Sequence, residues 1–454
     1  MSAKEIAIGF VPSFVRKYAR RIENSPTGHR LTTGAFWSLS GAVVSRVLAL
    51  GASILVARML GKEEFGKLGI IQSTVGMFQV FAGFGLGLTA TKYVAEFRDS
   101  DPLKTGRIIG LSAMVSAGTG VLMLLLLILF APWLSTHTLA APSLVGPLRL
   151  SALMLLLGAL NGAQTGALAG FEEFKTIARV NVLAGLANFP LMVAGVYFAG
   201  LQGAIAALVA SMGVNWILNH LALRSALRHA RVPVSFSGNS AELKVLWRFS
   251  TPAVLAGVMV GPITWICNAM LVNQPNGYAE MGVFNAANQW RGAILFLPGV
   301  VEAIILPVLS NLRGVGDRLR YRKVLLYNIW FNGALTLAVA AVISVLAPFI
   351  MATYGKGFRS SYRVLILLSF SAVLTATIGV IGQAIASEDR MWWGMFLNML
   401  WGCAMICASW LLVGYGAAGL ALAVLISYLF HLLTVGAYTY FSVLKTPEEE
   451  SSVS

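Results

Sequence analysis

The chain has 454 residues, of which 57% are apolar and only 11% are charged, and its mean hydropathy is +0.77. Soluble domains carry about 25% charged residues, so this composition excludes a soluble domain of any size. The net charge of +15 is therefore assigned to basic loops beside anionic lipid headgroups, and no nucleic-acid partner is expected.

Long apolar segments recur along the chain and predict an all-α polytopic membrane protein. A helix crosses a hydrocarbon core ~30 Å thick with about 20 residues, and it satisfies its own backbone polar groups in lipid. The apolar segments predict about twelve spans, at 32–57, 68–90, 108–130, 147–168, 179–199, 202–222, 249–273, 281–309, 325–350, 363–385, 391–413 and 417–440.

Lysine and arginine predict the orientation, because cytoplasmic loops carry an excess of both. With the N-terminus inside, the cytoplasmic segments hold 24 of the 33 basic residues, the outer loops hold 6, and 3 lie within spans. Both termini are therefore predicted in the cytoplasm. The N-terminal segment 1–31 is expected to contain an amphipathic helix at 5–22 that lies in the inner interface, and residues 441–454 to form a cytoplasmic tail.

The two halves of the chain resemble each other in three places. The matching segments are "EEFGKLGIIQ" (63–72) with "NGYAEMGVFN" (276–285), "LLILFAPWL" (126–134) with "AVISVLAPFI" (341–350), and "GLQGAIAALVAS" (200–211) with "GAAGLALAVLIS" (416–427). With Ala131-Pro132 matched to Ala347-Pro348 in the second pair, the offsets are 213, 216 and 216. An offset of six spans, an even number, predicts parallel repeats related by an axis along the membrane normal.

These repeats predict two similar lobes with a cleft between them. The N-lobe is expected at 32–222 and the C-lobe at 249–440, joined by a cytoplasmic loop at 223–248. Rocking of two such lobes would expose the cleft alternately to either side of the membrane, which is typical of a transporter.

Few ionisable residues are predicted deep in the membrane. Arg46 lies near the middle of the first span, and Arg291 and Glu302 lie three helical turns apart on one face of the eighth, with Asn288 one turn from Arg291. A charge at that depth costs about 2.5–3.5 kcal/mol, so each should face protein or water. Because deep arginines outnumber deep acids, the cleft is predicted to be cationic and to suit a phosphate-bearing substrate.

Each of these residues also has a purely structural interpretation. Arg46 could pair with Glu302 across the lobes, and Glu302 could instead titrate and couple transport to protons or sodium. Gln72 and Gln79, which share one face of the second span, are candidate substrate ligands, but amides in spans more often join helices. The same packing role is favoured for Asn161, Gln164, Asn215 and Asn219.

The sequence offers little for catalysis or for a metal. Its three cysteines, Cys267, Cys403 and Cys407, fall inside predicted spans, and the chain has no Walker lysine motif or HExxH. We therefore expect no catalytic residue, metal or cofactor, apart from the coupling ion that Glu302 could bind.

Three further segments resemble a known family. "LGKEEFGKLGIIQS" (60–73), "GFGLGLTATKYVAEFR" (83–98) and "YGKGFRSSYRVLILLS" (354–369) are similar to the polysaccharide transporter, or O-antigen flippase, family of the multidrug/oligosaccharidyl-lipid/polysaccharide exporter superfamily. The resemblance covers roughly residues 30–440.

The resemblance implies a flippase that moves undecaprenyl-pyrophosphate-linked oligosaccharide across a bacterial inner membrane, for surface polysaccharides such as the O-antigen of lipopolysaccharide. It implies cationic lumen residues, here Arg46 and Arg291, and a polysaccharide polymerase and a chain-length regulator as candidate partners of a functional monomer. About twelve spans argue against a fourteen-span lipid II flippase.

Two other functions compete with this hypothesis. A multidrug exporter of the same fold would place several acids in the lobes, whereas Glu302 is the one convincing deep acid in the sequence. A membrane glycosyltransferase or polymerase could use Glu63 and Glu64, but such enzymes carry a large outer loop and have no reason for a two-lobe repeat.

Overall fold

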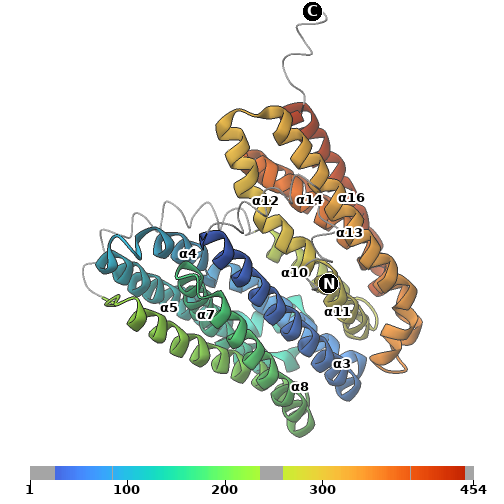
Figure 1. Ribbon diagram of the computed structural model, residues 1–454. Helices are drawn as coiled ribbons and strands as arrows, with labels where there is room; N and C mark the ends of the chain where they lie inside the picture. The colour runs from blue at the N-terminus through green and yellow to red at the C-terminus, as the bar shows by residue number, and fades with distance from the viewer. Residues whose placement is uncertain (1–25, 84, 236–258, 389, 445–454) are drawn as a thin grey trace, which may run out of the picture.

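The computed structural model describes residues 26–83, 85–235, 259–388 and 390–444, and their regular structure is entirely helical (Figure 1). The predicted helix at 5–22 and the beginning of the predicted seventh span lie outside the described residues. The main helices are α3 (Pro26–Gly83), α4 (Leu86–Phe97), α5 (Pro102–Trp133), α6 (Val145–Ser151), α7 (Leu153–Gly170), α8 (Phe174–His229), α10 (Val260–Val272), α11 (Gly277–Ile294), α12 (Phe296–Val315), α13 (Arg318–Thr353), α14 (Tyr362–Ser387), α15 (Met391–Leu412) and α16 (Gly416–Thr439).

Eight helical segments of the described residues are long and apolar enough to cross a membrane. One of them, α3, folds back at Gly61, whose φ of 76° suits glycine. Arg46 and Gln72 of this helix line one cavity, whereas the stretch between them would span about 39 Å as a straight helix. The segment therefore crosses more than once.

Two other long segments reverse in the same way. In α8 the backbone breaks at Ala199 and Gly200, and a Cβ added to Gly195 would collide with the carbonyl of Gly203. Between α15 and α16, Ser427 reaches back to within 3.1 Å of Met405 Sδ. These reversals match the predicted breaks between spans, and the number of about twelve spans stays a prediction.

Pro298 explains a difference from the predicted eighth span, 281–309. The structure divides this segment at Leu295 into α11 and α12. Proline has no N–H to donate to the carbonyl four residues earlier, that of Ile294, and its ring crowds that carbonyl. The helix therefore ends at Ile294 and starts again at Phe296.

Two helices continue beyond the predicted boundaries at 222 and 440. Helix α8 continues to His229, because Arg228 and His229 in its last turn complement the negative end of the helix dipole. A π-helical turn, η5 (Tyr440–Leu444), extends α16 into the predicted tail.

Equivalent side chains cap the two halves. Asp101 accepts a hydrogen bond from the Lys104 amide at the start of α5, and Asp317 does the same for Arg320 at the start of α13. The two caps are related by the same offset as the second and third matched segments of the sequence. The repeat therefore extends to the ends of the helices.

A similar ion pair occurs in each half, with the two acids 216 positions apart in the chain and the two arginines 215 apart. Arg98 pairs with Glu172 at 2.7 Å and donates to the carbonyl of Gly170. Arg313 lies 3.6 Å from Glu388 and donates to the carbonyl of Ser387. Glu172 and Glu388 occupy equivalent positions of the repeat, so each half ties its second span to its fourth with the same device.

The two halves form two helical bundles that meet along α3 and α11 and diverge toward α4 and α12 (Figure 1). A Cβ on Gly66 would collide with the Tyr278 carbonyl, and a Cβ on Gly282 would collide with the Lys62 carbonyl. The two contacts are related by a two-fold axis, in which Gly66 is equivalent to Gly282 and Lys62 is equivalent to Tyr278. The first matched pair of segments therefore shares the offset of the other two, and its alignment at 213 is wrong by three positions.

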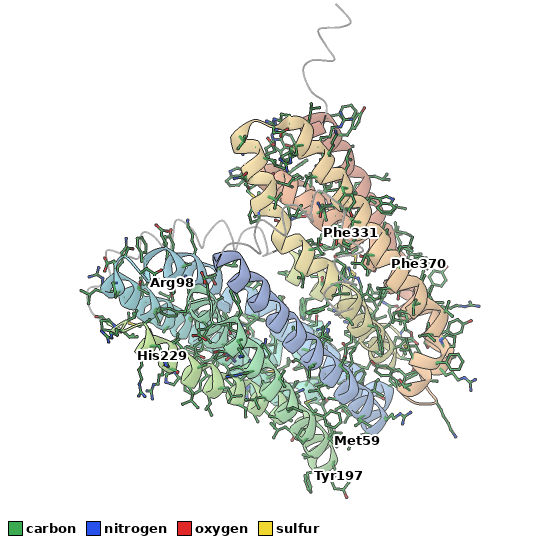
Figure 2. The ribbon with its side chains drawn as sticks, viewed as in Figure 1. Met59, Arg98, Tyr197, His229, Phe331 and Phe370 are labelled. Carbon is green, nitrogen blue, oxygen red and sulfur yellow. The ribbon has the colours of Figure 1, made fainter. Side chains whose placement is uncertain are left out.

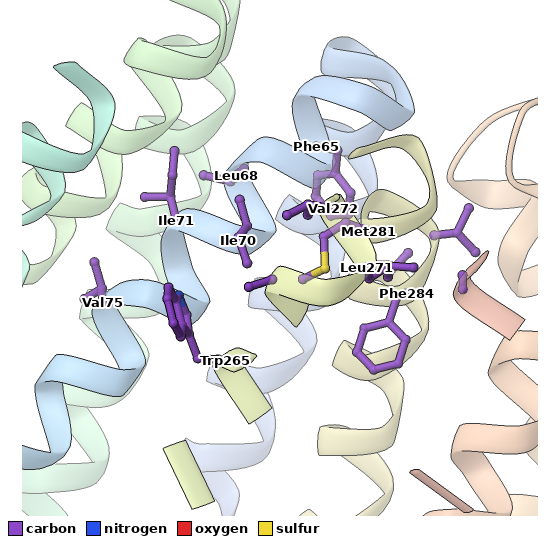
Figure 3. Close-up of a cluster of buried hydrophobic side chains, with 14 of the residues drawn as sticks. Phe65, Leu68, Ile70, Ile71, Val75, Trp265, Leu271, Val272, Met281 and Phe284 are labelled. Atoms are coloured by element: carbon purple, nitrogen blue, oxygen red, sulfur yellow. The ribbon is translucent and has the colours of Figure 1, made fainter. Parts of the chain in front are cut away.

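Apolar side chains fill the contact between the bundles around this glycine pair, which we call the glycine seam. Phe65, Leu68 and Ile71 of α3 lie with Met281 and Phe284 of α11 in one buried cluster (Figure 3). Figure 2 shows Met59 and Tyr197 at the seam end of the N-terminal bundle and Arg98 and His229 at its opposite end. The seam therefore closes one end of the space between the lobes.

Candidate functional site

Arg46 lines a cavity between the two bundles, which we call the Arg46 cavity. The cavity has a volume of about 270 Å³, and its polar lining residues come from α3, α8 and α11. They are Arg46, Ser53, Gln72, Asn188, Asn285 and Gln289. Arg46 is the one charged residue among those that line it.

The Arg46 side chain reaches across the space between the lobes. A Cβ added to Gly292 of α11 would collide with Nη2 of Arg46, so the guanidinium lies against the backbone of the opposite lobe. More than a third of the Arg46 side chain remains exposed. Glycine at 292 thus leaves room for a cation that faces the cavity rather than the protein core.

A second cavity, the amide cavity, adjoins the first. It has a volume of about 380 Å³ and shares Gln72 and Asn285 with the Arg46 cavity. Its other polar lining residues are Ser73, Thr264, Asn268 and Asn288, and none of its lining residues is ionisable. The structure therefore brings Arg46, Gln72 and Asn288 of the predicted residues to one continuous site.

Arg291 does not line either cavity. Its Nε donates to Ser371 at 2.9 Å, its Nη2 donates to Thr375 at 2.8 Å, and its guanidinium lies 5.1 Å from the centre of the Tyr428 ring. These partners belong to α14 and α16, so Arg291 points into the C-terminal bundle although its neighbour Gly292 faces the cleft.

Glu302 lines a third cavity of about 280 Å³ inside the C-terminal bundle, which we call the Glu302 cavity. Thr375, Asn398, Tyr428 and His431 also line it. The Glu302 carboxylate lies against Gly379, one helical turn along α14 from the Thr375 that binds Arg291. Arg291 is thus the near cation, in contact with a residue of this cavity.

Arg46 and Glu302 form no ion pair within the described parts of the chain. Arg46 lies against α11 in the inter-lobe cavity, whereas Glu302 lies against α14 in the C-terminal bundle. The break at Leu295 separates α12, which carries Glu302, from the part of α11 that meets Arg46. The interpretation of Arg46 as half of a buried pair therefore has no support from the geometry.

The remaining amides divide by the direction in which they point. Gln79 lies against Gly158 of α7, inside the N-terminal bundle and away from both inter-lobe cavities. Asn219 donates to Asn161 at 3.2 Å and to Asn215 at 3.1 Å, and Gln164 can bond Trp216. These residues join α7 to α8, as the packing interpretation predicts.

Sequence reasoning missed several residues of these sites, among them Asn188, Asn268, Asn285, Gln289 and His431. Asn188 lies two residues before Pro190, and Asn285 and Gln289 lie one turn apart on the face of α11 that carries Gly282 and Gly292. The small residues on that face mark where the lobes approach each other, and they were the available signal.

The sequence is similar to a known protein family and to proteins named for export and for lipid flipping. Residues 31–313 match the family model of polysaccharide biosynthesis proteins. The EPS I polysaccharide export inner membrane protein EpsE of Ralstonia solanacearum is 25% identical over 413 residues, covering 87% of this chain and 92% of that protein. The lipid III flippase of Escherichia coli (strain K12) is 22% identical over 410 residues, covering 88% and 95%.

Solved structures share the architecture. An inward-facing multidrug resistance MATE family transporter of the MOP superfamily superposes with a TM-score of 0.75 at 17% identity, covering 90% of this chain and 98% of that one. A MOP superfamily transporter from Pyrococcus furiosus, described as having a binding pocket of reverse polarity, gives 0.67 at 17% identity and covers 94% and 99%.

The relatives and the solved structures match this chain over nearly its whole length. The relatives named for export and for lipid flipping and the transporters that share the fold are consistent with a membrane transporter rather than an enzyme. The chain belongs to the polysaccharide biosynthesis protein family and has the fold of the MOP transporter superfamily.

Proposed function

We propose that this protein is a polysaccharide-export flippase that moves an undecaprenyl-pyrophosphate-linked oligosaccharide across a bacterial inner membrane. The relatives named for polysaccharide export and lipid III flipping support the substrate class. The observation that carries the proposal is Arg46, the one charged residue that lines the inter-lobe cavities among the residues that the structure describes. A guanidinium gives two parallel donors that match phosphate oxygens.

The glycine seam supports alternating access by such a substrate. Around it, Asn273 donates to the Thr138 carbonyl and Tyr278 donates to the Leu139 carbonyl, both at 2.7 Å, so several polar contacts also join the lobes at that end. The distribution of basic residues in the sequence predicts that the seam lies on the periplasmic side. In the proposed cycle, substrate enters from the cytoplasmic side, and opening of the seam releases it into the outer leaflet.

Reconstitution tests the role of Arg46. Purified protein in liposomes should flip a fluorescent short-chain prenyl-pyrophosphate disaccharide, measured by quenching of the probe in the outer leaflet. Arg46→Ala should lower the rate at least tenfold, and Arg46→Lys should lower it less, because an ammonium keeps the charge and loses the fork of two donors.

A second arginine provides the matched control. Arg149 lies in α6, is exposed, and lines none of the three cavities. Arg149→Ala should retain the flipping rate. A normal rate for Arg46→Ala at equal protein abundance would contradict the proposal, as would equal losses for the two alanine variants.

We further infer that Glu302 couples transport to protons rather than to sodium. Sodium is a hard cation that prefers several oxygen ligands. Thr375, Asn398 and Tyr428 offer oxygens in the Glu302 cavity, but Thr375 already binds the Arg291 cation, and the cavity also presents the imidazole of His431 and the indole N–H of Trp401. Neither His431 Nδ1 nor Trp401 Nε1 has a hydrogen-bond partner within the described residues. Protonation of Glu302 needs no oxygen cage.

A gradient experiment tests this coupling. An inward-directed proton gradient should accelerate outward flipping by the wild-type protein, and Glu302→Gln should remove that acceleration. Glu280→Gln is the control, because Glu280 accepts the Ala417 amide at 2.8 Å as a structural group and glutamine can keep that bond. Acceleration by a sodium gradient alone, lost in Glu302→Gln, would assign the site to sodium instead.

A further inference from the structure

The amide cavity has the chemistry of a carbohydrate subsite. Apart from backbone and apolar atoms, the described residues that line it offer side-chain amides and hydroxyls from both lobes and no charge. A sugar hydroxyl both donates and accepts, and an amide side chain supplies an acceptor oxygen and a donor nitrogen. Phe284 and Met77 add apolar surface for the faces of a sugar ring.

Two amides in this cavity have atoms left without partners. Asn268 is 5% exposed and donates to Ser73 at 2.9 Å, but its Oδ1 accepts no hydrogen bond within the described chain. The Nδ2 of Asn285 likewise has no acceptor there. Buried polar atoms without a partner cost free energy, and where they line a cavity, as these two do, a ligand that enters it can supply the missing partner. One unpaired acceptor and one unpaired donor are what a pair of hydroxyls requires.

The position of the cavity fixes which part of a substrate would reach it. Gln72 and Asn285 line both inter-lobe cavities, so the two are contiguous. A pyrophosphate held by Arg46 would place the sugars that follow it beside these amides. An acidic sugar would bring its carboxylate into a space without a lining cation and would lose its hydration there.

We propose that the amide cavity is a subsite for the uncharged sugars next to the pyrophosphate, whose hydroxyls bind to Asn268 and Asn285. The subsite would discriminate against acidic sugars at that position. This inference rests on the proposed function and deepens it by naming a sugar class. The cavity volume of about 380 Å³ lies within the about 300–1,000 Å³ range of small-molecule sites.

Three probes that differ in the sugar attached to a prenyl pyrophosphate test the subsite on the purified full-length protein. The first is a short-chain prenyl pyrophosphate without sugar, the second carries a neutral di-N-acetylhexosamine, and the third carries a disaccharide with a hexuronic acid first. We expect the neutral probe to bind tightest, and the ratio of its affinity to that of the sugar-free probe to exceed tenfold. The acidic probe should show little of that gain.

Substitutions test whether Asn268 and Asn285 cause the higher affinity of the neutral probe. Asn268→Leu and Asn285→Leu should each lower the neutral-to-sugar-free ratio by roughly two- to tenfold, and Asn285→Gln should restore part of it. Asn332→Leu is the matched control, because Asn332 on α13 is also buried with both amide atoms unpaired in the described chain and lines none of the cavities. That variant should keep the wild-type ratio.

The outcomes separate the subsite from the proposed function. Arg46→Ala should weaken all three probes by a similar factor. Failure of the sugar-free probe to bind the wild-type protein would overturn the phosphate site, and with it the proposed function. Binding of that probe with no gain from neutral sugars, or with an equal gain from acidic ones, would overturn the subsite alone. If Asn268→Leu does not fold, Asn285→Leu still decides, since no hydrogen bond of its amide nitrogen is lost.

Discussion

The glycine seam makes a sharp prediction about the conformational equilibrium. Gly66→Ala adds one methyl group where a Cβ would collide with the Tyr278 carbonyl of the other lobe. Ordinary carbon–oxygen contacts lie at about 3.3–3.6 Å, so the two backbones must separate by on the order of 1 Å. Gly282→Ala meets the Lys62 carbonyl in the equivalent way and should act alike.

The magnitude follows from the cost of overpacking. An added methyl in a close-packed contact costs about 1–3 kcal/mol. Because the cost falls on the closed seam alone, the ratio of closed to open molecules should drop by roughly 5- to 150-fold. Alanine also gains about 1 kcal/mol of helix propensity over glycine, but that gain applies to both states.

Distances between spin labels measure this ratio. Labels at Phe198, which is 82% exposed, and at the exposed Lys356 report on the N- and C-terminal bundles at the seam end, in a background without native cysteines. Gly66→Ala and Gly282→Ala should shift the distribution toward longer distances. Gly118→Ala is the control, since nothing lies within 4 Å of a Cβ there. Unchanged distributions for both seam variants, or equal shifts in the control, would refute the reasoning.

Two other predictions concern stability and orientation. Glu388→Gln should lower the midpoint of thermal unfolding more than Glu172→Gln. The Glu388 side chain is 8% exposed and faces two arginines, whereas the Glu172 side chain is 33% exposed and pairs with Arg98, and an exposed ion pair contributes about 1 kcal/mol or less. Equal unfolding midpoints of the two variants in detergent would contradict this. Reporter fusions after residues 100, 235, 316 and 446 should lie in the cytoplasm and those at 138 and 356 in the periplasm, and a periplasmic signal at 235 would break the two-lobe topology.

The all-helical membrane class and the family could be predicted from the sequence. Hydrophobic length is a local property, so the apolar segments indicate membrane helices before any packing is known. The parallel repeat also followed from local similarity, although one alignment was three positions out. The contact of Gly66 with Gly282 was needed to correct it, because short apolar segments match at several offsets.

Only some of the residues predicted for the candidate site line the inter-lobe cavities. Arg46, Gln72 and Asn288 were chosen for depth and polarity, and the structure brings them to the inter-lobe cavities. Arg291 and Gln79 were chosen on the same grounds, yet they point into the bundles and bind or touch their own lobes. Depth in the membrane can be read from a sequence, whereas the direction of a side chain cannot.

The direction of a side chain depends on how its helix is rotated against the neighbouring helices. Successive residues of a helix point about 100° apart, so Arg291 enters the C-terminal bundle while Gly292 meets Arg46 across the cleft. Pro298 then breaks the helix and turns Glu302 into a separate cavity. Local sequence is enough to establish that this chain lies in a membrane and is built twice. Which of its buried charges face a substrate depends on packing between helices distant in the chain, since no local pattern records how two lobes meet.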